Sequence, residues 1–135
     1  MEELAATPTP KIVVRAAEMD REEFDRILSS LDVSRTHEVF VGWTSWADIE
    51  PLGVTKASGL ESLRQRLGLP ACGTVAVGDG TNDIAMIDWA AFGVAMGGAS
   101  EEVRAHADHV TAAVDNDGAA AVMHAIMRRF GVAGR

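Results

Sequence analysis

The sequence has little cysteine, a shortage of basic residues and no long apolar run, and each shortage excludes a class of protein. Cys72 is the single cysteine, so an intrachain disulfide and a Cys/His zinc site are both excluded. The formal charge of −8, from 12 basic and 20 acidic residues, argues against nucleic acid and anionic membrane as partners. No apolar stretch approaches the ~20 residues of a membrane span. The first residues, MEELAATPTP, are acidic and polar, unlike a signal peptide, so we expect a cytoplasmic protein without a membrane partner.

The first fifty residues predict a strand, a helix and two further strands after a flexible tail at residues 1–10. Asp20 is a predicted helix N-cap, Glu23 completes a capping box, and Met19 with Phe24 forms a hydrophobic staple. Apolar residues then recur at helical spacing. The predicted strands are residues 11–16, 37–42 and 46–50.

A second pattern begins at Pro51, where helices and short apolar strands start to alternate. Ser58 and Glu61 predict a capping box for the first of these helices, and Gly68 predicts its end. The caps predicted for the later helices are Asn82, Ser100 and Asp117. The predicted strands are residues 74–77, 92–96 and 109–113. This alternation is typical of an α/β fold with a parallel sheet covered by helices.

The stretch GDGTNDIAM, residues 78–86, gathers two carboxylates where a buried strand meets a helix. Asp79 follows the strand directly, at the edge where open parallel sheets bind ligands. Asp83 lies in the first turn of the next helix and can face the same space. Oxygen ligands grouped in this way suit Mg²⁺, although Asp79 could merely shape a turn and Asp83 merely favour a helix N-terminus. Asp83 stands where a dinucleotide fingerprint needs glycine, and no Gly-Lys-Ser/Thr of a Walker A loop follows.

GDGTNDIAMI, with FGVAMGGASEEVRAHADHVT after it, resembles the fourth motif and downstream region of haloacid dehalogenase-like (HAD) phosphatases of the Cof-type, class IIB branch. Upstream, ADIEPLGVTKASGLESLRQRLGL resembles the segment where that branch leaves its cap domain and presents its motif III lysine. The resemblance covers roughly residues 10–130. It implies part of a HAD Rossmann-like parallel sheet with helices on both faces. Residues 11–50 would be the end of an α/β (C2-type) cap, and residues 51–135 the C-terminal part of the core.

The resemblance also implies site residues and a reaction. Asp79 would be a Mg²⁺ ligand, and Asp83 would support the metal or its water shell. Asn82 would contact the phosphoryl group or the lysine, and Lys56 would neutralise phosphate charge and orient the nucleophile. Positioning and charge stabilisation of this kind supply most of the catalysis of phosphoryl transfer. The implied activity is Mg²⁺-dependent hydrolysis of a small phosphorylated metabolite such as a sugar phosphate.

One part of the family pattern is missing from the sequence. Family members begin with DxDGT or DxDGV, which supplies the nucleophile, whereas the sole DxDG here is DNDG at residues 115–118, near the C-terminus. We favour a helix cap there over a displaced nucleophile. The chain therefore resembles the C-terminal half of a phosphatase, and the alternatives are a non-catalytic binding module or one subunit of a split enzyme. Without the missing strand, residues 74–77 would form a bare sheet edge, which predicts a homo-oligomer or a partner chain.

Overall fold

The computed structural model describes residues 9–42 and 44–131, so the predicted tail lies almost wholly outside the described residues. The chain divides into two compact units, Met1–Val54 and Thr55–Arg135. The predicted change of pattern at Pro51 falls on the last residue of a strand, shortly before this division. Among the described residues, no helix combines the length and apolar character needed to cross a bilayer.

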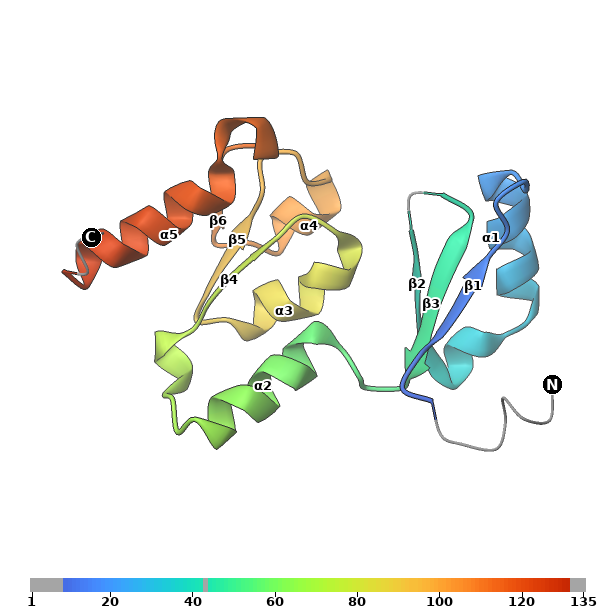
Figure 1. Cartoon of the computed structure of the whole chain (residues 1–135), viewed down its shortest axis with the longest axis horizontal. Helices are drawn as coiled ribbons and strands as arrows, with labels where there is room; N and C mark the ends of the chain where they lie inside the picture. Colours follow the sequence, from blue (N-terminus) through green and yellow to red (C-terminus); the bar gives the residue numbers. More distant parts are fainter. Residues whose placement is uncertain (1–8, 43, 132–135) are drawn as a thin grey trace. The chain divides into compact units, whose positions relative to one another are not determined.

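The first unit is a three-stranded antiparallel sheet with one long helix (Figure 1). Its elements are β1 (Ile12–Arg15), α1 (Arg21–Ser30), the 3-10 turn η2 (Val33–Arg35), β2 (His37–Val41) and β3 (Trp46–Pro51). β3 lies between β1 and β2. Phe24 and Leu28 of α1 pack on Ala47 and Ile49 of β3, because residues two apart on a strand face the same side. The predicted cap is present, since the Asp20 carboxylate accepts hydrogen bonds from the N–H groups of the first turn.

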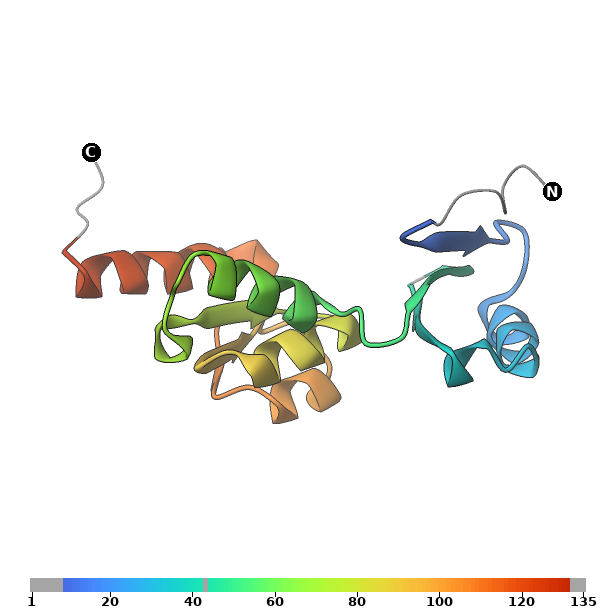
Figure 2. The same cartoon turned by 90° about the horizontal axis from the view of Figure 1, so that it is seen from below.

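The second unit is a parallel sheet in the order β4-β5-β6, and it confirms the predicted α/β class. Its strands are β4 (Val75–Gly78), β5 (Phe92–Ala95) and β6 (His109–Val110). Its helices are α2 (Lys56–Arg66), α3 (Ile84–Trp89), α4 (Glu101–Ala105) and α5 (Gly118–Arg129). The 3-10 turns are η3 (Ala71–Gly73), η4 (Thr81–Asp83) and η5 (Val114–Asn116). Helices α2 and α3 run side by side (Figure 2).

The two faces of this parallel sheet carry different side chains. On one face, Ala95 joins the buried cluster of Ile87 and Val103 from α3 and α4. On the other face, Val75 and Val94 line an apolar hollow of about 700 Å³ together with residues of α5. Alternate residues of a strand point to opposite faces, so the small residues admit α3 while the valines face α5.

Three predicted helix N-caps differ from the structure. Helix α2 begins after Thr55 and not after Ser58, because Thr55 and Ser58 exchange the two hydrogen bonds of a capping box. Asn82 lies inside η4, and α3 begins at Ile84 without a side-chain cap. Asp117 precedes α5 as predicted, but it adopts a left-handed conformation (φ 54°) and its side chain makes no capping hydrogen bond.

Candidate active site

The predicted metal site lies in a tight turn between β4 and α3, formed by residues 78–83 and called the corner below. Gly78 ends the strand, and the chain then passes through η4 into α3. A Cβ atom at Gly78 would lie 2.4 Å from the Cβ of Asp83, so the turn closes only around glycine. Because β4, β5 and β6 are parallel, this turn lies at the carboxyl edge of the sheet, where ligands of such folds bind.

Asp83 is the anchor of this corner. Its side chain is buried, and Oδ2 accepts hydrogen bonds from the backbone N–H groups of Asp79 and Gly80 at 2.9 and 3.0 Å. Oδ1 forms an ion pair with the ammonium of Lys56. Burial alone would raise the pKa of this carboxyl, but the hydrogen bonds from Lys56, Gly80 and Asp79 outweigh burial and hold the pKa below its usual value. Asp83 is therefore an ionised group that fixes both the turn and the lysine.

Lys56 reaches the corner from the first residue of α2. The capping box of Thr55 fixes where this helix starts, and so fixes where the lysine leaves the backbone. The lysine side chain is 49 % exposed, whereas that of Asp83 is 6 % exposed. The ammonium is thus held by a buried carboxylate on one side and is open to a ligand on the other. The structure brings together two residues that lie 27 positions apart in the sequence.

Asp79 and Asn82 are the exposed members of the corner. Within the described part of the chain, the carboxylate of Asp79 makes no hydrogen bond or ion pair, whereas its backbone N–H is held by Asp83. No group of three or more His, Cys, Asp or Glu side chains gathers among the described residues. Asp79 therefore offers one free carboxylate, in a setting where any further ligands of a cation would be water or substrate oxygens.

The DNDG stretch lies at the same edge of the sheet but not beside Asp79. It follows β6, and β5 separates β6 from β4. Two strand spacings correspond to roughly 10 Å. Gly118 is buried, and a Cβ there would lie 1.9 Å from the carbonyl oxygen of Ala112, so the stretch serves a close approach of two backbone segments.

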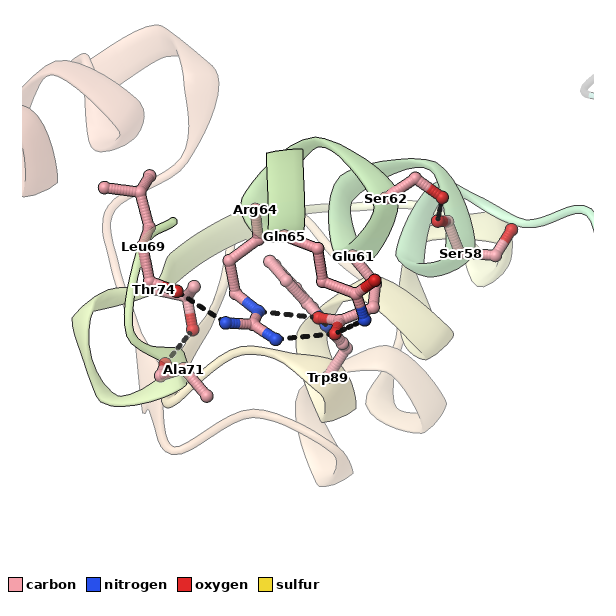
Figure 3. A network of polar contacts seen from close by, with 9 residues as sticks. All are labelled: Ser58, Glu61, Ser62, Arg64, Gln65, Leu69, Ala71, Thr74 and Trp89. Carbon is pink, nitrogen blue, oxygen red and sulfur yellow. Dashed lines mark hydrogen bonds and ion pairs between the residues drawn. The ribbon is translucent and has the colours of Figure 1, made fainter. Parts of the chain in front are cut away.

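Sequence reasoning missed a polar network on the side of α2 that faces α3 (Figure 3). Glu61, expected to cap α2, instead accepts hydrogen bonds from Arg64, Gln65 and Trp89. These bonds lower the pKa of Glu61 to about 2, with Arg64 as the largest cause. The spacing of Glu61, Arg64 and Gln65 by three and four residues could have predicted the contacts within α2. The contact with Trp89 spans 28 positions and carries no local signal, although a partly buried indole N–H needs an acceptor.

Comparisons with known proteins decide the family. The family model of haloacid dehalogenase-like hydrolases matches residues 2–123. This chain belongs to that family. A subclass IIB sugar phosphatase of the HAD superfamily, BT4131, has a structure that is 35 % identical in sequence and superposes with a TM-score of 0.74. The match covers 98 % of this chain and 47 % of that one. The resemblance drawn from GDGTNDIAM, and the HAD α/β fold that it implied, are confirmed.

Two relatives show how much of a HAD protein the chain represents. The 5-amino-6-(5-phospho-D-ribitylamino)uracil phosphatase YcsE of Bacillus subtilis is 34 % identical over 104 residues, which are 76 % of this chain and 42 % of that one. A short uncharacterized protein encoded in the pdhA 5′ region of Geobacillus stearothermophilus is 42 % identical over 80 residues, 58 % of this chain and 84 % of that one. This HAD chain thus spans less than half the length of the phosphatases that it matches.

Proposed function

We propose that the chain supplies the lysine and acidic side of a Mg²⁺-dependent phosphatase site for a small, sugar phosphate-like metabolite. The observation that carries the proposal is the ion pair of Lys56 with buried Asp83, next to the free carboxylate of Asp79. The similarity to a HAD sugar phosphatase supports the choice of substrate class. The acidic charge and the single cysteine favour action in the cytoplasm.

The donor set fits Mg²⁺ with Asp79 as the direct ligand. Mg²⁺ keeps several waters and is commonly held by one or two carboxylates together with substrate phosphate. Asp79 is exposed and offers both oxygens. Asp83 already holds three hydrogen-bond donors, so it suits an indirect role through the turn or a bound water. When bound, the cation would add positive charge at the phosphoryl oxygens.

Lys56 and Asn82 would neutralise the charge of the substrate phosphate and fix its position. The Lys56 ammonium, held by Asp83 and open on its other side, would neutralise a phosphoryl oxygen. Asn82 is exposed in η4, where its amide can donate to the same group. Both residues hold the phosphate in place for attack, which is the main task of a phosphoryl-transfer site.

The nucleophile would come from polypeptide outside these 135 residues. Among the described strands, β4 pairs only with β5, so its other edge is free. Val75 and Phe92, beside the apolar hollow, are 42 % and 46 % exposed. A bare apolar edge next to a hollow invites another strand. In a purified sample the available polypeptide is a second copy of the chain, so we expect a dimer formed through this edge.

Light scattering at micromolar concentration tests whether the chain dimerises through the free edge of β4. The wild-type chain should have the mass of a dimer, and Val75→Lys should have that of a monomer, because a charge on an edge strand blocks pairing. Leu52→Lys, at another exposed apolar position, is the control and should remain dimeric. A wild-type chain that is monomeric throughout would contradict the proposal.

Hydrolysis of p-nitrophenyl phosphate tests the proposed activity. It is measured on the chain mixed with a second polypeptide that carries the DxDGT strand, because another copy of this chain adds no nucleophile. Hydrolysis should depend on Mg²⁺ and fall by about 100-fold or more in Asp79→Asn, since the free carboxylate is lost. Asp115→Asn is the matched control: it removes an exposed carboxylate at the same sheet edge and should leave the rate unchanged. A rate that falls only in Asp115→Asn would instead identify DNDG as a displaced nucleophile.

The second candidate, a non-catalytic binding module, rests on the missing DxDGT motif. It predicts that Mg²⁺ shifts the amide NMR signals of Gly78 and Gly80 while no hydrolysis occurs. In Asp79→Asn these shifts should disappear. Hydrolysis that requires Asp79 would rule this candidate out.

A further inference from the structure

Helix α2 carries Lys56 but has little apolar attachment to the rest of its unit. None of its side chains, all of which are described, is buried. Of the three leucines at helical spacing, Leu60 is half-buried, and Leu63 and Leu67 are 50 % and 60 % exposed. Apolar burial normally supplies most of the stability of a helix in a protein. The position of α2 must therefore depend on a small number of specific contacts.

One of these contacts joins the middle of α2 to the end of α3. The indole Nε1–H of Trp89 donates to Oε2 of Glu61 at 2.9 Å. Arg64 holds the same carboxylate from within α2, with Nε 2.7 Å from Oε2 and one terminal nitrogen 2.6 Å from Oε1. These two hydrogen bonds from Arg64 fix the plane of the Glu61 carboxylate, so that one of its oxygens faces the indole (Figure 3).

The Glu61–Trp89 contact and the Lys56–Asp83 ion pair connect the same two segments. Lys56 is five residues before Glu61 on α2, so the backbone positions that carry the two contacts lie about 7.5 Å apart along the helix axis. Asp83 directly precedes α3, and Trp89 is its last residue. A helix held at one point can rotate or slide, whereas a helix held at two points has a fixed register against its neighbour.

We propose that Glu61 and Trp89 are positioning residues, and that their hydrogen bond keeps α2 in the register that places the Lys56 ammonium on Asp83. Neither residue touches the predicted phosphate site. Their effect reaches that site through the helix that carries Lys56.

The chain offers a clean readout because Lys56 and Lys11 are its two lysines. Lys11 forms an ion pair with Asp48 in the other unit, so it serves as an internal reference. Hydrogen exchange of each lysine ammonium group can be followed by NMR of protein labelled with ¹⁵N-lysine. An ammonium group that is held in an ion pair exchanges its protons more slowly than a free one.

Trp89→Phe removes the indole N–H and keeps a smaller aromatic ring in its place. The Lys56 ammonium should then exchange about fivefold faster, the factor expected for loss of one ordinary hydrogen bond. Lys11 should be unchanged. Glu61→Leu should give the same result from the other side of the contact, and Glu61→Gln, which keeps an oxygen acceptor, should restore most of the slow exchange.

Gln65→Leu is the matched control. Gln65 donates to Oε1 of Glu61 at 2.7 Å, but it lies on α2 and makes no link to α3. Its loss should leave the exchange of Lys56 unchanged. If Trp89→Phe and Glu61→Leu both fold and lower the melting temperature while Lys56 exchanges as in the wild type, the network only stabilises the unit and the proposal is wrong. The measurement uses no substrate, so its result is independent of whether the chain hydrolyses phosphate.

Discussion

The two lysines of the chain form the same kind of ion pair in two different settings. Lys11 pairs with Asp48 at 2.7 Å across the edge of the antiparallel sheet, where the side chains are 42 % and 18 % exposed. Lys56 pairs with Asp83, whose side chain is almost completely buried. Asp83 also accepts two backbone hydrogen bonds, whereas Asp48 makes none with its side chain among the described residues apart from the bond from Lys11.

The difference shows what separates a surface ion pair from a structural one. An exposed pair gains little, because water screens the charges and the side chains lose freedom. A buried carboxylate that is already satisfied by backbone N–H groups cannot be removed without leaving those groups unpaired. The Lys56 pair should therefore matter for both stability and ligand binding, and the Lys11 pair for neither to any large extent.

The two ion pairs should differ most in the unfolding free energy that is lost when the carboxylate of each pair is removed. Asp83→Ala leaves two N–H groups and one ammonium without their acceptor, and should lower the free energy of unfolding of the second unit by about 3 kcal/mol. Asp48→Ala should cost the first unit at most ~1 kcal/mol. Amide hydrogen exchange in β5 and in β3 measures the two units separately. Equal losses in the two variants would remove the distinction between the pairs.

The two units should also respond to opposite extremes of pH. The pKa of Glu61 falls to about 2 in the folded chain, from an ordinary value of 4.5. A lowered carboxyl pKa gives stability that is present above the ordinary pKa and is lost as the pH falls through 4.5 towards 2. The second unit should therefore weaken in that window, and Glu61→Gln should flatten the dependence. Urea unfolding at several pH values, followed at β5 amides, measures it.

At alkaline pH, the first unit should be the one that loses stability. The hydrogen bond with Asp48 raises the pKa of Lys11 above its ordinary value. A raised lysine pKa gives stability that is complete below the ordinary value of 10.5 and is lost as the pH rises through the folded value. The loss should be small, because the pair is exposed, and Lys11→Met should abolish it. An alkaline loss of equal size in Lys11→Met would assign it to other groups.

Local patterns in the sequence predicted much of this fold. Asp20 and Ser100 cap the helices for which they were predicted, because an N-cap depends only on residues within one turn. Gly68 takes the left-handed conformation after α2, as its position at a helix end predicts. Around Ser58 the sequence allows two overlapping capping boxes, Thr55 with Ser58 and Ser58 with Glu61. Thr55 and Ser58 form the capping box, since the carboxylate of Glu61 is engaged by Arg64 and Trp89.

The candidate site depends on contacts that local patterns do not encode. Asp79 and Asp83 are four residues apart and could be grouped from spacing alone. Lys56 and Asp83 are 27 residues apart, so only the resemblance to the HAD family indicated that they meet. The failed cap at Asn82 has a local origin instead: the buried carboxylate of Asp83 accepts from the N–H groups of Asp79 and Gly80, and residues 81–83 form the 3-10 turn η4.

The smallest expected difference between the two ion pairs is in how their coupling energies respond to salt. Salt largely screens exposed charges that are farther apart than about 10 Å at 0.1 M and about 3 Å at 1 M, and it screens buried charges much less. The coupling energy between Lys11 and Asp48, measured with a double-mutant cycle to alanine, should be small in 0.05 M NaCl and fall to near zero in 1 M NaCl. The coupling between Lys56 and Asp83 should keep more than about half of its low-salt value, because protein atoms shield one partner from ions. If both couplings vanished together in 1 M NaCl, burial of Asp83 would not protect the pair, and Lys56 would be free to leave it when phosphate binds.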